Sequence, residues 1–167
     1  MDVLRGLFGS SVRSAEALGS GSEHSIISEL TSWRTGRPSG LFRFRIELQT
    51  GGAIQPRDVI VKVKPSDRRA IEVGEALARV CDDGIGDAYG RWSDRLGLVG
   101  GHVRELEIFA QSDPRFTEHA PTRLASLADD ERESWILALE RVTDGVLMDS
   151  AARPEAWTGS HLSAALR

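Results

Sequence analysis

The sequence lacks several features that define common classes of small protein. Its single cysteine, Cys81, excludes an internal disulfide framework and a cysteine-rich zinc site. No apolar run approaches the roughly 20 residues that cross a bilayer, and Met1 to Phe8 lacks the apolar region of a secretory signal. We therefore expect a soluble, cytoplasmic protein with no membrane partner.

Positive charge is also in short supply, and lysine above all. The chain carries 21 Lys and Arg against 25 Asp and Glu, a net charge of −4. Because a general nucleic-acid binder needs surplus cations to neutralise phosphates, we expect no nucleic-acid partner. The only two lysines, Lys62 and Lys64, stand in one short segment. Lysine supplies a compact point charge that arginine does not replace, which makes this segment a candidate site.

The 167 residues are enough for one ordinary domain with a hydrophobic core. Residues 1–24 are small and polar and predict a flexible leader. Strand-like patterns follow over residues 41–48, 59–64, 122–127 and 135–142, and residues 25–33 fit either a strand or a short helix. Since a hairpin loop joins the first two clear strands, we predict an α+β fold: a five-stranded antiparallel sheet with helices on one side.

Two further segments have helical spacing. Ser66 and Asp67 begin the first, and its apolar residues recur as far as Cys81, so we expect this cysteine to pack in the core. The second runs from His102 to Ala110, with apolar residues on one face.

The segment Val59–Lys64 predicts a strand with two different faces. Side chains alternate along a strand, so the valines share one face while Ile60, Lys62 and Lys64 share the other. The turn-rich stretch Gly36–Gly40 precedes the neighbouring strand. A glycine-bearing turn above a strand lysine can hold nucleotide phosphates through backbone N–H groups and the ammonium. The alternative is that both lysines are solvated charges on a sheet edge.

Two later segments bear on the same chemistry. Glu105 lies on the helix that follows the lysine strand, and a helix carboxylate can hold a strand lysine extended by forming an ion pair. The alternative is a solvated helix face with Arg104 and Glu107. Residues 135–145 form an apolar strand that runs into a polar connector, and this can supply the apolar slot and backbone groups that adenine needs. Alone, this pattern equally indicates a core strand ending in a turn.

Taken in order, these segments resemble the N-terminal lobe of the aminoglycoside phosphotransferase and choline-kinase-like family, within the protein-kinase-like fold. The resemblance covers residues 25–145. Its motifs are the turn Thr35–Gly40 before Leu41–Leu48, then Val59–Pro65, His102–Phe109, Pro121 and Ile136–Val142. Two features depart from the family: the turn is not a Gly-x-Gly-x-x-Gly, and the link Ser66–Gly101 is long enough for an extra helix.

The resemblance implies a nucleotide-binding lobe with ATP as its cofactor. Lys62 would contact the α- and β-phosphates and Glu105 would pair with it, as the two catalytic residues of this lobe. The other expected nucleotide contacts are Gly36, Ser39 and Gly40 in the turn, Ile60 in the adenine pocket, and Glu140 and Val142 at the hinge.

The resemblance also implies what lies elsewhere. In the family, the base that acts on the acceptor hydroxyl and the Mg²⁺ ligands belong to a C-terminal lobe. We expect residues 146–167 to be the start of a truncated lobe of this kind, with the Mg²⁺ ligands outside this chain and no metal ligands within it. The parent protein would be a kinase that transfers the γ-phosphate to the hydroxyl of a small-molecule substrate. This chain alone would be inactive.

Two other functions stay open. A lobe kept alone would be a binding or regulatory module, forming a homodimer or docking a partner through the surface where the second lobe would sit. An RNA-binding sheet would instead stack bases on Phe42 and Phe44, which alternate with Arg43 and Arg45.

Overall fold

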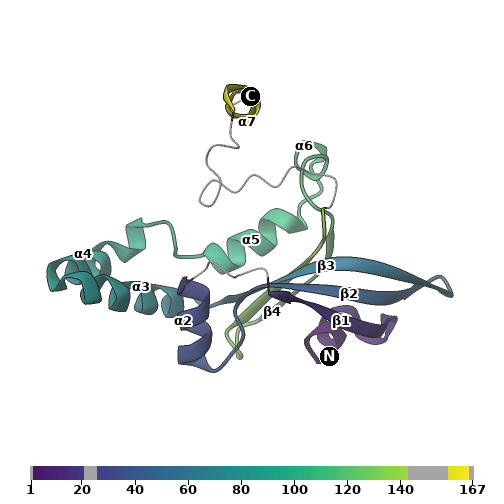
Figure 1. Ribbon diagram of the computed structural model, residues 1–167, viewed down its shortest axis with the longest axis horizontal. Helices are drawn as coiled ribbons and strands as arrows, with labels where there is room; N and C mark the ends of the chain where they lie inside the picture. Colours follow the sequence, from purple (N-terminus) through teal and green to yellow (C-terminus); the bar gives the residue numbers. More distant parts are fainter. Residues whose placement is uncertain (1, 21–25, 143–157, 166–167) are drawn as a thin grey trace.

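The computed structural model describes residues 2–20, 26–142 and 158–165 (Figure 1). The segment 143–157 lies outside the described residues. It contains the expected lobe boundary at residue 145 and most of the expected truncated lobe.

Five strands form one antiparallel sheet, which confirms the predicted α+β fold class. In chain order they are β1 (Val12–Ser20), β2 (Gly40–Thr50), β3 (Ala53–Pro65), β4 (Arg123–Asp129) and β5 (Ser134–Glu140). Their spatial order is β1-β2-β3-β5-β4, and every neighbouring pair is antiparallel. β3, the strand with both lysines, therefore occupies the centre of the sheet and is hydrogen-bonded on both sides.

The helices lie before, between and after the strands. They are α1 (Asp2–Phe8), α2 (Ile26–Thr35), α3 (Asp67–Cys81), α4 (Asp83–Trp92), α5 (Gly101–Ala110), α6 (Pro114–Thr117) and α7 (Gly159–Ala165), with short 3₁₀ turns at Gly9–Ser11 and Ser93–Arg95. The long link before α5 thus holds two helices, α3 and α4. Cys81 ends α3 and is exposed, so the prediction that it packs in the core is wrong.

The prediction of a flexible leader is wrong for residues 2–20. This segment forms α1 and the edge strand β1, whose Val12 pairs with Leu48 and whose Ala15 pairs with Ile46. An edge strand bonds to one neighbour only, so its small and polar residues give a weak pattern in the sequence. β1 is thus the strand that completes the predicted five-stranded sheet. Residues 26–35 form the helix α2 and not a strand.

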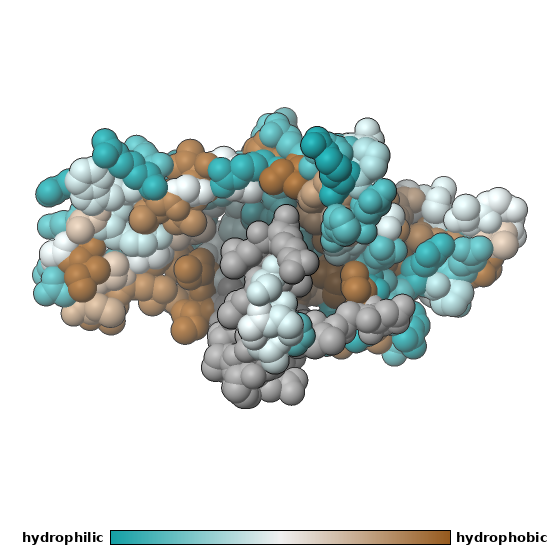
Figure 2. All heavy atoms as spheres, turned by 90° about the horizontal axis from the view of Figure 1, so that it is seen from above, coloured by the Kyte–Doolittle hydropathy of each residue, from teal (hydrophilic) through white to brown (hydrophobic). Residues whose placement is uncertain are grey.

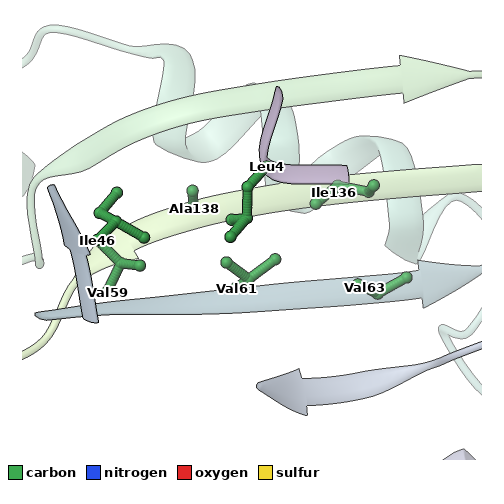
Figure 3. Close-up of a cluster of buried hydrophobic side chains, with 7 residues drawn as sticks. All are labelled: Leu4, Ile46, Val59, Val61, Val63, Ile136 and Ala138. Atoms are coloured by element: carbon green, nitrogen blue, oxygen red, sulfur yellow. The ribbon is translucent and has the colours of Figure 1, made fainter. Parts of the chain in front are cut away.

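The core lies on the valine face of β3. Val59, Val61 and Val63 are 0%, 1% and 9% exposed, and they pack with Ile46, Ile136, Ala138 and Leu4 (Figure 3). Phe42 and Phe44 pack against the same cluster. Because this packing occupies both rings, they are not free to stack on RNA bases, which argues against the RNA-binding alternative.

Helices contact both faces of the sheet, whereas the sequence predicts them on one side only. α1 brings Leu4 onto the valine face, and α5 lies on the opposite side (Figure 1). None of the helices in the described part of the chain is long and apolar enough to cross a membrane.

Leu4→Ala is expected to lower the free energy of unfolding by about 2–5 kcal/mol, because it leaves a cavity in the core. The side chain of Leu4 is 3% exposed. Leu96→Ala is the matched control, since Leu96 is 49% exposed, and it should change stability by less than about 0.5 kcal/mol. Urea denaturation measures both, and equal small effects would show that α1 does not contribute to the core.

Candidate functional site

Lys62 and Lys64 share one carboxylate on the face of β3 opposite the valines. The Nζ atom of Lys62 lies 2.6 Å from Oε1 of Glu105, and Nζ of Lys64 lies 2.8 Å from Oε2. The alternation of β3 therefore brings Lys62 to Glu105 as expected, and it also brings Lys64, whose pairing we did not predict. The two ammonium groups thus share one carboxylate, and a second carboxylate, that of Asp67, lies close by on the N–H of Gly101.

The position of α5 explains why Glu105 reaches the sheet. α5 crosses β4 and β5, and its first residue, Gly101, is held at both of its backbone polar groups. The N–H of Gly101 donates to Oδ2 of Asp67 at 2.9 Å, and its carbonyl accepts from Nζ of Lys64, also at 2.9 Å. Asp67 is the first residue of α3. Lys64 therefore joins β3 to α5 at two points, and Asp67 ties α3 to the same helix end.

His102 and Trp135 complete the contact between α5 and the sheet. The two ring centroids are 4.0 Å apart with a 60° tilt. Nδ1 of His102 lies 2.8 Å from Oδ2 of Asp67, but without the alignment of a hydrogen bond. Sequence reasoning missed Asp67, His102 and Trp135 as parts of this cluster. The only signal for Lys64 was its placement two residues after Lys62, on the same strand face.

The ionisation of Glu105 is set by two opposing effects. Burial raises the pKa of this carboxyl, whereas hydrogen bonds and charge from Lys62 and Lys64 lower it. The lowering effects together are larger, so the pKa of Glu105 lies below its ordinary value. Glu105 is therefore charged at neutral pH and holds both ammonium groups in place.

An apolar strip lies beside Lys62 on the same face. Ile60 is two residues before Lys62 and stands opposite Leu139 of β5. Lys62 itself stands between Leu41 and Leu137 of the two neighbouring strands. Ile60 is half-buried and Leu137 is 2% exposed. Leu137 is covered, so the half-buried Ile60 and Leu139 provide the apolar surface next to the charged cluster.

Glu140 and Val142, the expected hinge residues, lie at the end of β5. The Glu140 carboxylate accepts hydrogen bonds from the backbone N–H and the hydroxyl of Thr122, at 2.9 and 2.7 Å. These bonds lower the pKa of Glu140. The Glu140 N–H donates to the Thr122 carbonyl, so both its side chain and its amide already have partners. Val142 is 59% exposed.

The Gly36–Gly40 turn does not extend over Lys62. Gly40 pairs with Val63 at the start of β2, and Gly36 follows α2 with a left-handed φ of 64°. Ser39 is 7% exposed; its hydroxyl donates to the Ser28 carbonyl and its N–H to Oγ of Ser32. The prediction that Ser39 contacts nucleotide is therefore replaced by a structural role. Arg37, Pro38 and Ser39 line a separate cavity at the end of β3.

Exposed apolar side chains gather on the helices at one end of the molecule (Figure 2, left). Between α2 and α3 they line a groove formed by Leu30, Trp33, Val73, Ala76, Leu77 and Val80, with Arg34 beside them. Trp33 and Val80 are each 84% exposed. The residues that line this groove are not those of the Lys62–Glu105 cluster.

Glu105→Gln should lower the free energy of unfolding by about 1–3 kcal/mol, because it leaves two neighbouring ammonium groups without their carboxylate. Glu107→Gln is the matched control, since Glu107 lies on the same helix and is exposed, and its effect should stay below about 0.5 kcal/mol. Urea denaturation at neutral pH compares them. Equal effects would show that the cluster does not hold α5 on the sheet.

The stabilising effect of Glu105 should depend on pH in a defined direction. Its folded pKa is depressed, so the contribution is complete above the unfolded pKa of about 4.3 and is lost as the pH falls through the folded value. The difference in unfolding free energy between wild type and Glu105→Gln should therefore be constant near neutrality and shrink in acid. A difference that grows with acidification would contradict the assignment.

The described residues contain no group of three or more His, Cys, Asp or Glu side chains placed to hold a metal ion. Comparison of the chain with protein-family models, curated proteins and solved structures finds no match.

Proposed function

We propose that the face of the sheet carrying Lys62 and Glu105 binds ATP, and that the chain is the nucleotide-binding lobe of a small-molecule phosphotransferase. The observation that supports this most is the 2.6 Å pair between a central-strand lysine and a helix glutamate, on a face that also carries an apolar strip. The order of strand lysine, helix glutamate and final apolar strand is also that of the aminoglycoside phosphotransferase and choline-kinase-like family.

Each residue has a definite part in this proposal. Lys62 donates from its ammonium to oxygens of the α- and β-phosphates, and a charge-assisted bond of this kind is stronger than a neutral one. Glu105 keeps that ammonium extended, so the lysine is oriented before the nucleotide arrives. Lys64 shares the same carboxylate and so adds a second ammonium group to the cluster. Ile60 and Leu139 contact the adenine ring.

The transfer step itself needs more than this face. A carboxylate must orient the attacking hydroxyl, and Mg²⁺ must neutralise the β- and γ-oxygens. We propose that residues beyond the described part supply both, together with the site for the hydroxyl-bearing substrate. The described residues grip and orient the nucleotide, and activity requires the complementary lobe.

Binding of a fluorescent ATP analogue to the full chain tests the proposal. Lys62→Met should weaken the affinity roughly tenfold or more, because one charge-assisted bond to phosphate is lost. Arg57→Met is the matched control: it removes a cation from the same strand, at an exposed position, and should leave the affinity unchanged. Equal affinities in Lys62→Met and wild type, or no binding by wild type, would overturn the proposal.

A further inference from the structure

A second candidate site lies at the end of the sheet, where α2, β3, α3 and the β4–β5 turn meet. These elements enclose a cavity of about 300 Å³. Three arginines line it, each from a different segment: Arg34 from α2, Arg37 from the turn after it, and Arg69 from α3. Among the described residues, Glu133 is the one carboxylate that lines it.

The positive charge around this cavity exceeds the negative charge that faces it. Glu72 and Glu133 are shared by Arg34, Arg68 and Arg69, at distances of 3.3 to 3.8 Å. Arg37 donates to the carbonyl of Arg132 and, among the described residues, forms no close ion pair, although its charge acts on the carboxylate of Asp129. The nearby carboxylate of Asp129 is taken by Arg132 at 2.8 Å.

Four guanidinium groups therefore face the two carboxylates of Glu72 and Glu133, which leaves a surplus of two positive charges. The four belong to Arg34, Arg37, Arg68 and Arg69. A recess concentrates such a field more than a flat surface does. Guanidinium groups also present paired N–H donors that match the oxygens of phosphate.

The carboxylate of Glu133, the one such group that the described residues place in the lining, is held by long contacts. The φ of Glu133, 47°, is in the left-handed region, which is unfavourable for a non-glycine residue. Its oxygens lie 3.4 Å from Oγ of Ser66 and 3.4 Å from Nε of Arg69, long for charge-assisted bonds. A dianion within the cavity can make shorter bonds to Arg69 than this carboxylate does.

The remaining walls indicate the size and character of the ligand. Pro38, Val63 and Pro65 give apolar contact, and Ser134 gives a polar one. A cavity of this volume is at the lower end of the range for small-molecule sites. We infer that this cavity binds a phosphoryl group, as free phosphate or as a small phosphate monoester, through Arg37 and Arg69 with Arg34 beside them.

This site is separate from the one in the proposed function. Neither Lys62 nor Glu105 lines the cavity. Lys64 does line it, but its ammonium is held by Glu105 and the Gly101 carbonyl. The two sites can therefore be tested independently with variants of Lys62 and Arg37.

Calorimetric titration of the full chain with inorganic phosphate and with phenyl phosphate tests the inference. Arg37→Gln and Arg69→Gln should each weaken binding roughly tenfold, since each removes a charge-assisted donor. Glu133→Gln should tighten binding, because it removes the competing negative charge. Arg115→Gln is the matched control, as Arg115 is exposed and outside the cavity lining, and Lys62→Met should also leave phosphate binding unchanged.

The two probes distinguish the source of the phosphoryl group. Tighter binding of phenyl phosphate supports a monoester that also contacts the apolar walls, and equal binding supports free phosphate. Circular dichroism checks that each variant is folded, and Arg37→Lys, which keeps the charge but loses the paired donors, should give an intermediate affinity. No binding by wild type, wild-type binding by Arg37→Gln, or loss of phosphate binding in Lys62→Met alone would overturn the inference.

Discussion

The central position of β3 is the constraint on which the rest of this structure depends. Hydrogen bonds to β2 on one side and β5 on the other fix its register. The register in turn fixes which face of the sheet each side chain of β3 occupies. Val59, Val61 and Val63 must enter the core, and Lys62 and Lys64 must leave it on the opposite face. A slip of one residue would bury both ammonium groups. The register of β3 therefore determines both the core and the position of the candidate site.

The sharing of Glu105 by two lysines gives the site its rigidity. Lys64 also bonds to the Gly101 carbonyl, and Asp67 bonds to the Gly101 N–H, so the first turn of α5 is attached to both β3 and α3. A shift of α5 would break these contacts together. The orientation of Lys62 is thus linked to α3, and the same helix supplies Arg69 to the second cavity.

Much of this arrangement follows from local pattern. The alternation of residues 59–64 and the helical spacing of residues 102–110 left the ion pair between Lys62 and Glu105 as one of two alternatives, and the family resemblance predicted it. The contact of Asp67 with Gly101 depends on how a helix pair folds back, which no local period encodes. β1 escaped prediction because an edge strand needs little apolar pattern. The Gly36–Gly40 turn was placed over Lys62 in error, because its direction depends on α2, whose helical state the sequence left open.

Because the chain has only two lysines, selective labelling of lysine is the most direct measurement. Labelling with isotopically enriched lysine gives side-chain NMR signals from Lys62 and Lys64 alone, and Lys62→Met assigns them. If Lys62 binds the phosphates of ATP, titration with ATP should shift the Lys62 signal more than that of Lys64, and the shift should saturate. An unchanged Lys62 signal at saturating ATP would contradict the account.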